Sequence, residues 1–193
     1  MKDRYFYPLA LLVIAGIIVL ALRPGAKPDG PSDADIAENG YSMTGNELER
    51  LVAAPGTLVS FETDEFGKVH FAALSSNLPR KMAAASAGVF ATLGPQYERV
   101  FADKQLKITI VARAGNINPL EKFEAGYFTA GTGDSGWKPF DLGADYHSYS
   151  FTFTPKGGGN PGNDYVGIWP GADGKNKVMN VKSIRVEVLS PKP

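Results

Sequence analysis

The sequence lacks cysteine entirely and contains only two histidines among its 193 residues. The absence of cysteine excludes disulfides, thiol catalysis and lipidation at a cysteine. The 20 basic and 20 acidic residues cancel, so no overall field recruits nucleic acid, and we predict no nucleic-acid partner. A Ser-His-Asp triad is not expected either, because the chain lacks the sharp turn that presents a catalytic serine. We therefore predict that the protein is not an enzyme.

The composition favours turns and short elements over long helices. Glycine contributes 22 residues and proline 14, and both residue types interrupt helices. The hydrophobic share of 44% is ordinary for a folded domain, and the chain length allows one substantial domain with appendages.

The longest uncharged run lies near the N-terminus and covers Tyr5–Leu22. A helix of these 18 residues spans roughly 27 Å, close to the thickness of the hydrocarbon core of a bilayer. The run begins with three aromatic residues, which favour the headgroup zone. A cleaved signal peptide is the alternative, but the following LALRPGAK offers only a poor small-x-small cleavage site. Residues 1–23 are therefore predicted to be a single transmembrane helix that contacts the lipid bilayer.

Basic residues flank this run on both sides, so the positive-inside comparison is nearly balanced. Lys2 and Arg4 precede the run, whereas Arg23 and Lys27 follow it. The short N-terminal flank favours a cytoplasmic N-terminus, with the folded domain exported to the periplasm or the cell surface.

Residues 24–40 are predicted to be a short linker. The stretch contains three prolines and scattered acidic residues but no hydrophobic periodicity. Such a composition is typical of an extended, solvated segment. The folded domain would then comprise residues 41–193.

A capping box at the start of this domain predicts a short helix. Thr44 and Glu47 have the required spacing, and Pro55-Gly56 ends the segment. The apolar stripe of the helix is expected at Leu48, Leu51 and Val52. A short amphipathic helix of this kind usually covers one end of a β-domain, and we assign it no catalytic role.

The stretch 137–154, WKPFDLGADYHSYSFTFT, is the clearest strand signal in the chain. Residues 147–154 alternate, with His147 and three aromatic residues on one face and hydroxyls on the other. A shorter strand precedes them, and the chain is expected to reverse at residues 143–145. Every other strand is expected to cover this aromatic face.

Further short strands are predicted on both sides of this stretch. Their bounds are 57–61, 69–74, 88–93, 97–101, 106–113, 121–130, 163–169 and 181–189, and the third and fourth flank Gly94-Pro95 as in a hairpin. Alternation places Leu106, Ile108, Ile110 and Ala112 on one face of the fifth strand, and Ile184, Val186 and Val188 on the inner face of the last. Residues 81–87 are either a helical turn or a loop. Because no helix-crossover rhythm is present, we predict an all-β domain in which two antiparallel sheets form a jelly-roll sandwich.

The order of the later segments resembles the galactose-binding-like jelly roll, a superfamily that includes many carbohydrate-binding modules. The segments are LKITIVARAG, FEAGYFT, GWKPFDL, YHSYSFTFT, YVGIWP and VKSIRVEVL, within residues 88–189. Members of this family often carry a structural calcium near the first and last strands. Here Glu62 and Asp64 stand at the first strand, but the last offers Lys182 where an acid would be needed. We therefore predict no metal and no cofactor.

Aromatic side chains are the candidate ligand-binding residues, because sugar rings stack their C–H faces on aromatic rings. Val166 and Ile168 supply the buried face of their strand, so alternation places Trp169 on the opposite face, open to solvent. Trp137 leads into a strand, and an indole at that place also commonly covers a sandwich core. The candidates are Trp169, Tyr165, Trp137 and Tyr127, with Arg113 and Glu124 as partners for sugar hydroxyls.

These observations predict a membrane-anchored module that binds carbohydrate or another cell-envelope ligand without turnover. The alternative is a structural or assembly protein whose sandwich binds a partner protein of the envelope. Coplanar aromatic residues over a shallow groove would favour sugar. An apolar patch without groups that bind hydroxyls would favour protein.

Overall fold

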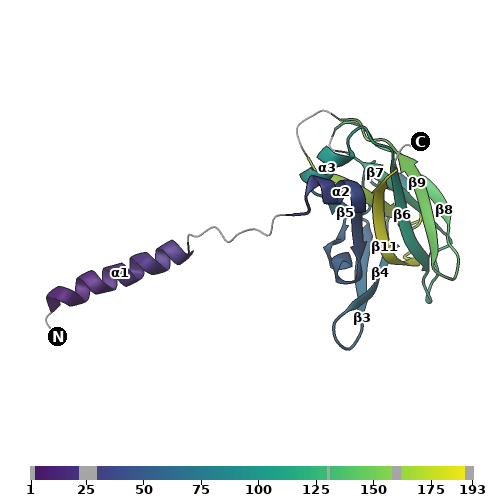
Figure 1. Ribbon diagram of the computed structural model, residues 1–193. Coiled ribbons are helices and arrows are strands. Elements are labelled where there is room, and N and C mark those ends of the chain that lie inside the picture. Colours follow the sequence, from purple (N-terminus) through teal and green to yellow (C-terminus); the bar gives the residue numbers. More distant parts are fainter. Residues whose placement is uncertain (1–2, 22–29, 130, 158–161, 190–193) are drawn as a thin grey trace. The chain divides into compact units, whose positions relative to one another are not determined.

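The computed structural model describes residues 3–21, 30–129, 131–157 and 162–189 (Figure 1). Contacts divide the chain into two units, Met1–Ser32 and Asp33–Pro193. Residues 3–21 of the first unit form the helix α1 (Asp3–Ala21), so the helical conformation predicted for this segment is confirmed. In the described residues, no helix combines the length and the apolar character that crossing a membrane requires. The membrane anchor stays a prediction, and residues 22–29 of the predicted anchor and linker lie outside the described residues.

The second unit begins with a helix that the sequence did not predict, α2 (Asp33–Asn39). Its Ile36 is fully buried, and Asp33 accepts two hydrogen bonds from Arg99 at 2.6 and 3.2 Å. The prediction of an extended linker is therefore wrong for these residues. Ile36 is the one large apolar side chain among the seven residues, so the sequence shows no helical periodicity and this helix depends on packing against the sandwich.

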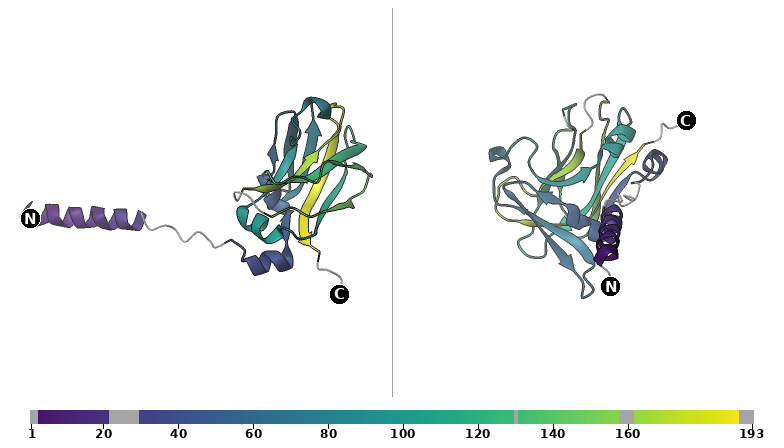
Figure 2. Two further views of the ribbon diagram at one scale, coloured as in Figure 1. Left: turned by 90° about the horizontal axis from the view of Figure 1, so that it is seen from above. Right: turned by 90° about the vertical axis from the view of Figure 1, so that its left-hand side faces the viewer.

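In the part of the chain that the structure describes, eleven strands form two antiparallel sheets, which confirms the predicted two-sheet sandwich. The six-stranded sheet has the order β3-β4-β11-β6-β9, with β1 also paired to β11. The five-stranded sheet has the order β2-β5-β10-β7-β8. Figures 1 and 2 show α2 and a second short helix, α3 (Pro95–Phe101), side by side at one end of the sandwich. The strand bounds are β1 (Tyr41–Thr44), β2 (Val52–Ala53), β3 (Thr57–Thr63), β4 (Val69–Ser76), β5 (Val89–Leu93), β6 (Leu106–Ala114), β7 (Lys122–Phe128), β8 (Lys138–Asp141), β9 (His147–Phe153), β10 (Asp164–Trp169) and β11 (Val178–Val188).

The alternation predicted for the long strands is confirmed by their burial. Leu106, Ile108, Ile110 and Ala112 of β6 are at most 1% exposed, and the residues between them face outward. On β11, Ile184 and Val186 are likewise buried. The core of the sandwich therefore lies where the period-two pattern placed it.

The aromatic strand β9 does not have the central place that the sequence suggested. It pairs only with β6 and forms an edge of the six-stranded sheet, whereas β11 pairs with three strands. Its Tyr149, Phe151 and Phe153 pack against the core but stay partly exposed. The reversal at residues 143–145 carries the chain from one sheet to the other, because β8 pairs with β7 in the five-stranded sheet.

One predicted strand is a helix. Residues 97–101 belong to α3 (Pro95–Phe101), which begins with Gly94 at the N-cap and proline at the first helical position. Proline is favoured there because its missing N–H has no partner in the first turn of any helix. The hairpin predicted around Gly94-Pro95 is therefore wrong.

The predicted capping box is present, but the helix that it opens is short. Residues Gly45–Arg50 form a 3₁₀ helix, η1, in which the backbone N–H of Thr44 donates to Glu47 Oε2 at 3.3 Å. Val52 lies in β2 and is 58% exposed, so it does not belong to the buried stripe. A second 3₁₀ turn, η2 (Arg80–Met82), overlaps the start of residues 81–87, for which the sequence allows either a helical turn or a loop.

Candidate functional site

The candidate site lies on the outer face of the five-stranded sheet, where β10 presents Tyr165, Gly167 and Trp169. Val166 and Ile168 are fully buried on the opposite face, as alternation predicted. The strand register places Tyr165 opposite Phe128 of β7 on one side and Thr92 of β5 on the other. Gly167 lies between Gly126 and Phe90 in the next register row.

Four aromatic side chains cross this face, and we call them the aromatic row: Phe90, Tyr165, Phe128 and Trp137. Neighbouring ring centroids are 5.0, 5.4 and 4.9 Å apart in that order. Tyr165 and Phe128 are stacked with an interplanar angle of 18°.

Two glycines make room for the indole of Trp137. A Cβ atom added at Gly88 or at Gly167 would lie only 3.1 Å from Cη2 of that ring. The indole therefore lies directly on the backbone of the sheet, at positions where a larger residue would displace it.

Arg80 of η2 covers one end of the aromatic row. Its guanidinium carbon is 4.8 Å from the ring centroid of Trp137 and 5.2 Å from that of Trp169. The guanidinium also donates to the carbonyl oxygens of Ala84 and Ala85, at 3.1 and 2.5 Å. Trp137 Nε1 donates to the same Ala85 oxygen at 2.8 Å. These contacts hold residues 80–85 across part of the sheet.

Trp169 faces outward as predicted, but the expectation that solvent reaches it is wrong. The side chain is fully buried beneath Arg80, and its Nε1 donates to the carbonyl oxygen of Gly171 at 2.8 Å. Alternation identifies the face of a strand but not the loop that covers it. The covering residue is nearly ninety positions away in the sequence.

Tyr127 is also buried, because it faces the core together with Phe123 and Ala125 of β7. Its hydroxyl donates to Asp164 Oδ2 at 2.6 Å, and Asp164 is fully buried as well. Burial raises the pKa of the Tyr127 hydroxyl far above its usual value, and the nearby Asp164 carboxylate raises it further. The predicted contact between Tyr127 and a ligand is therefore not available in this conformation.

Arg113 lies on the other sheet, where its guanidinium carbon is 5.0 Å from the ring centroid of Tyr146. Glu124 does belong to the site, because its Oε2 lies 4.0 Å from Arg80 Nε. Of the six predicted residues, the structure thus brings together Trp169, Tyr165, Trp137 and Glu124. Sequence reasoning missed Arg80, Phe90 and Phe128. The two phenylalanines were detectable in principle, since both occupy outward positions of predicted strands.

A groove of about 380 Å³ opens beside the uncovered end of the row, and we call it the aromatic groove. Phe90, Thr92 and Tyr165 of the paired strands β5 and β10 line it, and we call them its floor. The other lining residues, which we call its border, are Val52, Ala54, Pro55, Ala84, Ser86 and Ala87. The groove thus offers two aromatic side chains beside a few hydroxyls, which suits a ligand with apolar C–H faces and polar edges.

Asp64, one of the acids considered for calcium, closes the β3–β4 turn. Its Oδ1 accepts hydrogen bonds from the backbone N–H groups of Lys68 and Phe66, both at 2.9 Å. The bond from Lys68 is the main reason why the pKa of Asp64 lies below its usual value. Among the described residues, no three His, Cys, Asp or Glu side chains lie close enough together to hold a metal ion.

Comparison with known proteins identifies the fold. No protein-family model and no curated protein matches the sequence. Solved structures do match. The N-terminal CBM22-1-CBM22-2 tandem domain of Paenibacillus barcinonensis Xyn10C aligns at a TM-score of 0.55 and 10% identity, over 81% of this chain and 49% of that one. The CBM22-1 xylan-binding domain of the same protein aligns at 0.53 and 9% identity, over 79% of this chain and 95% of that one.

A third match is the CBM22-1-GH10 part of Clostridium thermocellum endo-1,4-beta-D-xylanase 10B, in a complex with xylohexaose. It aligns at a TM-score of 0.52 and 6% identity, over 82% of this chain and 29% of that one. At such identities the likeness concerns the fold alone. The resemblance to the jelly roll of carbohydrate-binding modules is thereby confirmed.

Proposed function

We propose that this chain is a non-catalytic binding module that holds a neutral sugar chain in the aromatic groove. The observation that carries the proposal is the position of Tyr165. Its ring stacks on Phe128, packs edge-on to Phe90 and forms part of the groove floor. A ring fixed by two neighbours loses little conformational freedom when a ligand binds to it.

The groove has the chemistry that such a ligand needs. The Phe90 and Tyr165 rings supply apolar surface for the C–H face of a sugar. Thr92 and Ser86 bring hydroxyls that donate to and accept from sugar hydroxyls. The fold that this chain shares with a xylan-binding domain also supports the proposal.

The test compares sugar binding of the full chain with that of two single variants. The wild type is first applied to an array of neutral glycans that includes xylohexaose, and the best ligand is then titrated. We expect Tyr165→Ala to weaken binding about 30-fold, because a central aromatic anchor contributes about 2 kcal/mol. The matched control is Phe66→Ala, which removes an aromatic side chain that is 86% exposed in the β3–β4 turn. Failure of the wild type to bind any neutral glycan, or an equal loss in both variants, refutes the proposal.

A partner protein is the second candidate ligand for the same groove. The observation that favours it is the apolar border, where Val52 is 58% exposed and is followed by Ala54 and Pro55. Thr92→Val separates the two candidates, since it keeps the shape of the floor and removes a hydroxyl. A sugar complex should weaken severalfold in this variant, whereas an apolar protein contact should be unchanged or stronger.

We also propose that the chain is anchored in a membrane through Tyr5–Leu22, with its folded unit outside the cytoplasm. The support is the uncharged sequence of that run and the poor cleavage site after it. A reporter fused after Pro193 should be active only outside the cytoplasm, and the mature protein should keep Met1. A processed N-terminus near Ala26 would contradict the anchor.

A further inference from the structure

The outer face of the six-stranded sheet carries an uneven distribution of charge. On β6 the outward positions include Lys107 and Arg113, and on β11 they include Lys182 and Arg185. We call these four residues the basic face. On the outward positions of β1, β6, β9 and β11 that the structure describes, Glu187 is the one acidic side chain. A chain with balanced total charge therefore concentrates cations on these four strands, whereas the outward residues of β3 in the same sheet include Glu62.

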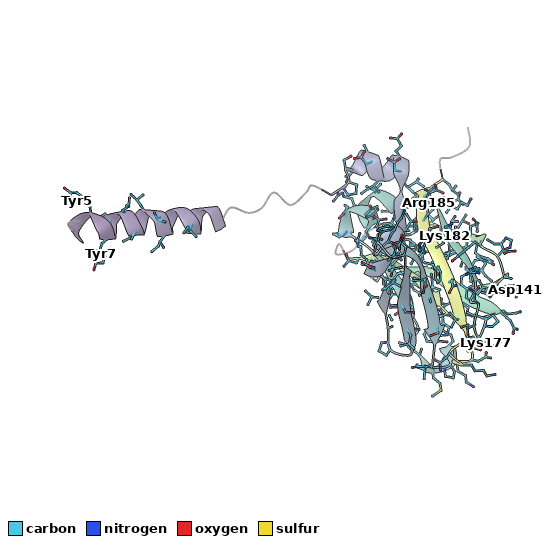
Figure 3. All side chains as sticks on the ribbon, turned by 90° about the horizontal axis from the view of Figure 1, so that it is seen from below. Tyr5, Tyr7, Asp141, Lys177, Lys182 and Arg185 are labelled. Carbon is cyan, nitrogen blue, oxygen red and sulfur yellow. The ribbon has the colours of Figure 1, made fainter. Side chains whose placement is uncertain are left out.

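Three of these cations, Lys107, Lys182 and Arg185, are exposed, and Arg113 is half-buried. Arg185 Nη1 lies 3.3 Å from Glu187 Oε1, in a pair that solvent reaches. Arg113 and Lys182 both approach the ring of Tyr146, with 5.0 Å from the guanidinium carbon and 5.6 Å from Nζ to the centroid. Figure 3 labels Lys182 and Arg185 along β11, away from Asp141.

Hydroxyl groups occupy the positions between the cations. The register aligns Thr44 with Ser183 in one row, and Ser42, Arg185, Thr109 and Ser150 in the next. A groove of about 380 Å³ crosses these rows, and Lys107, Arg185 and Glu187 also line it. Each hydroxyl both donates and accepts, so the groove can bind a chain that carries many hydroxyls of its own.

We infer that the basic face is a second binding surface, for a polysaccharide that carries carboxylate groups. The cations complement the carboxylates, and the hydroxyl rows complement the free hydroxyls of the sugar units. Lys107 and Arg113 are six residues apart on β6, which corresponds to about 20 Å, so the face spans several sugar units. This surface lies on the sheet opposite the aromatic groove and does not depend on the function proposed for that groove.

The experiment titrates the full chain with polygalacturonate and with its methyl-esterified form, which keeps the backbone and loses the charge. We expect the esterified polymer to bind at least tenfold more weakly. The double variant Lys107→Gln, Arg185→Gln should weaken polygalacturonate binding about tenfold, at roughly threefold for each exposed charge contact. Raising the salt from about 0.1 M to about 1 M should also weaken binding, since the screening length falls from about 10 Å to about 3 Å.

Two control variants test whether polygalacturonate binds at the basic face. The double variant Lys68→Gln, Lys138→Gln changes the net charge equally but alters exposed lysines outside the basic face, and it should bind as the wild type does. Tyr165→Ala should also keep polygalacturonate binding, which separates this inference from the function of the aromatic groove. Each variant is checked for an unchanged thermal unfolding curve.

Several outcomes would overturn the inference. Equal binding of the esterified polymer would show that charge is not recognised, and an equal loss in the Lys68/Lys138 variant would show that only net charge matters. Tighter binding of poly(dT) or dextran sulfate than of polygalacturonate would assign the face to a different polyanion. A wild type that does not bind polygalacturonate refutes the inference directly.

Discussion

Replacement of Asp164 by asparagine should make the folded protein more stable at neutral pH. Asp164 is fully buried at the start of β10, and its Oδ2 accepts the hydrogen bond from Tyr127 at 2.6 Å. Its Oδ1 has no hydrogen-bond partner among the described residues. Burial raises the pKa of this carboxyl, the Tyr127 hydrogen bond lowers it in part, and the nearby Glu98 raises it again.

The direction of the pH dependence follows from this raised pKa. A group whose pKa is higher in the folded than in the unfolded state favours folding when it is protonated. The stabilising contribution of Asp164 is complete at pH values below its pKa in the unfolded chain, near 3.9. This contribution is lost as the pH rises through its pKa in the folded protein. As the pH rises towards neutral, the wild type therefore loses this contribution, whereas asparagine is neutral at every pH and its Oδ1 can still accept from Tyr127.

Asp164→Asn should raise the free energy of unfolding by about 1–3 kcal/mol at pH 7. This is the usual cost of a buried polar group that is incompletely hydrogen-bonded. Urea unfolding of the full chain between pH 4 and pH 7 measures it. The difference between variant and wild type should shrink towards pH 4. Tyr127→Phe is the companion variant, and it should lose stability more strongly at pH 7 than at pH 4. An Asp164→Asn variant that is less stable than the wild type at pH 7 would refute the reasoning.

Three further changes test the packing. Gly167→Ala should destabilise the sandwich by about 1–3 kcal/mol and alter the near-ultraviolet circular dichroism. The reason is that the added Cβ would lie 3.0 Å from Cε2 of Phe128 and 3.1 Å from Cη2 of Trp137. Ile36→Ala should lower the free energy of unfolding by about 2–5 kcal/mol in denaturant titrations, and no change would mean that α2 is not part of the folded unit. Phe151→Ala should lower the free energy of unfolding by less than the roughly 3–5 kcal/mol of a fully buried phenylalanine, and Thr152→Ala should change it by no more than about 0.5 kcal/mol. Equal losses of stability in thermal unfolding would contradict the register of β9.

Period-two alternation predicted the parts of the fold that depend on neighbouring residues in one strand. It identified the buried face of β6 and the outward direction of Trp169 correctly. It could not predict that Arg80 lies over that indole, since this contact joins segments that only the folded chain brings together. The helix α2 was not predicted for the same reason, because its stability comes from the burial of Ile36 against other elements.

Helix α3 is a different case, because a local signal for it was available. Gly94 followed by Pro95 is compatible both with a turn and with the start of a helix. The predicted hairpin assumed the turn, whereas the structure has the helix start. Val100 and Phe101 at the end of α3 are buried, so the helix turns its last residues into the core. A helical spacing of apolar residues over Tyr97, Val100 and Phe101 distinguishes the two interpretations.

The charge distribution shows why total charge is a poor guide to binding surfaces in a sandwich. The equal numbers of acidic and basic residues give no overall field, and the sequence therefore predicts no nucleic-acid partner. Strand alternation, however, sorts charges by face, and pairing then places outward residues of distant segments side by side. Lys107 comes to lie near Glu187, and Arg185 beside Thr109, only because β6 pairs with β11 in this register. A polyanion is attracted by the charges within a screening length of its own, about 10 Å at 0.1 M salt. Local charge on one face, rather than the sum over the chain, therefore decides whether this sandwich attracts an acidic polymer.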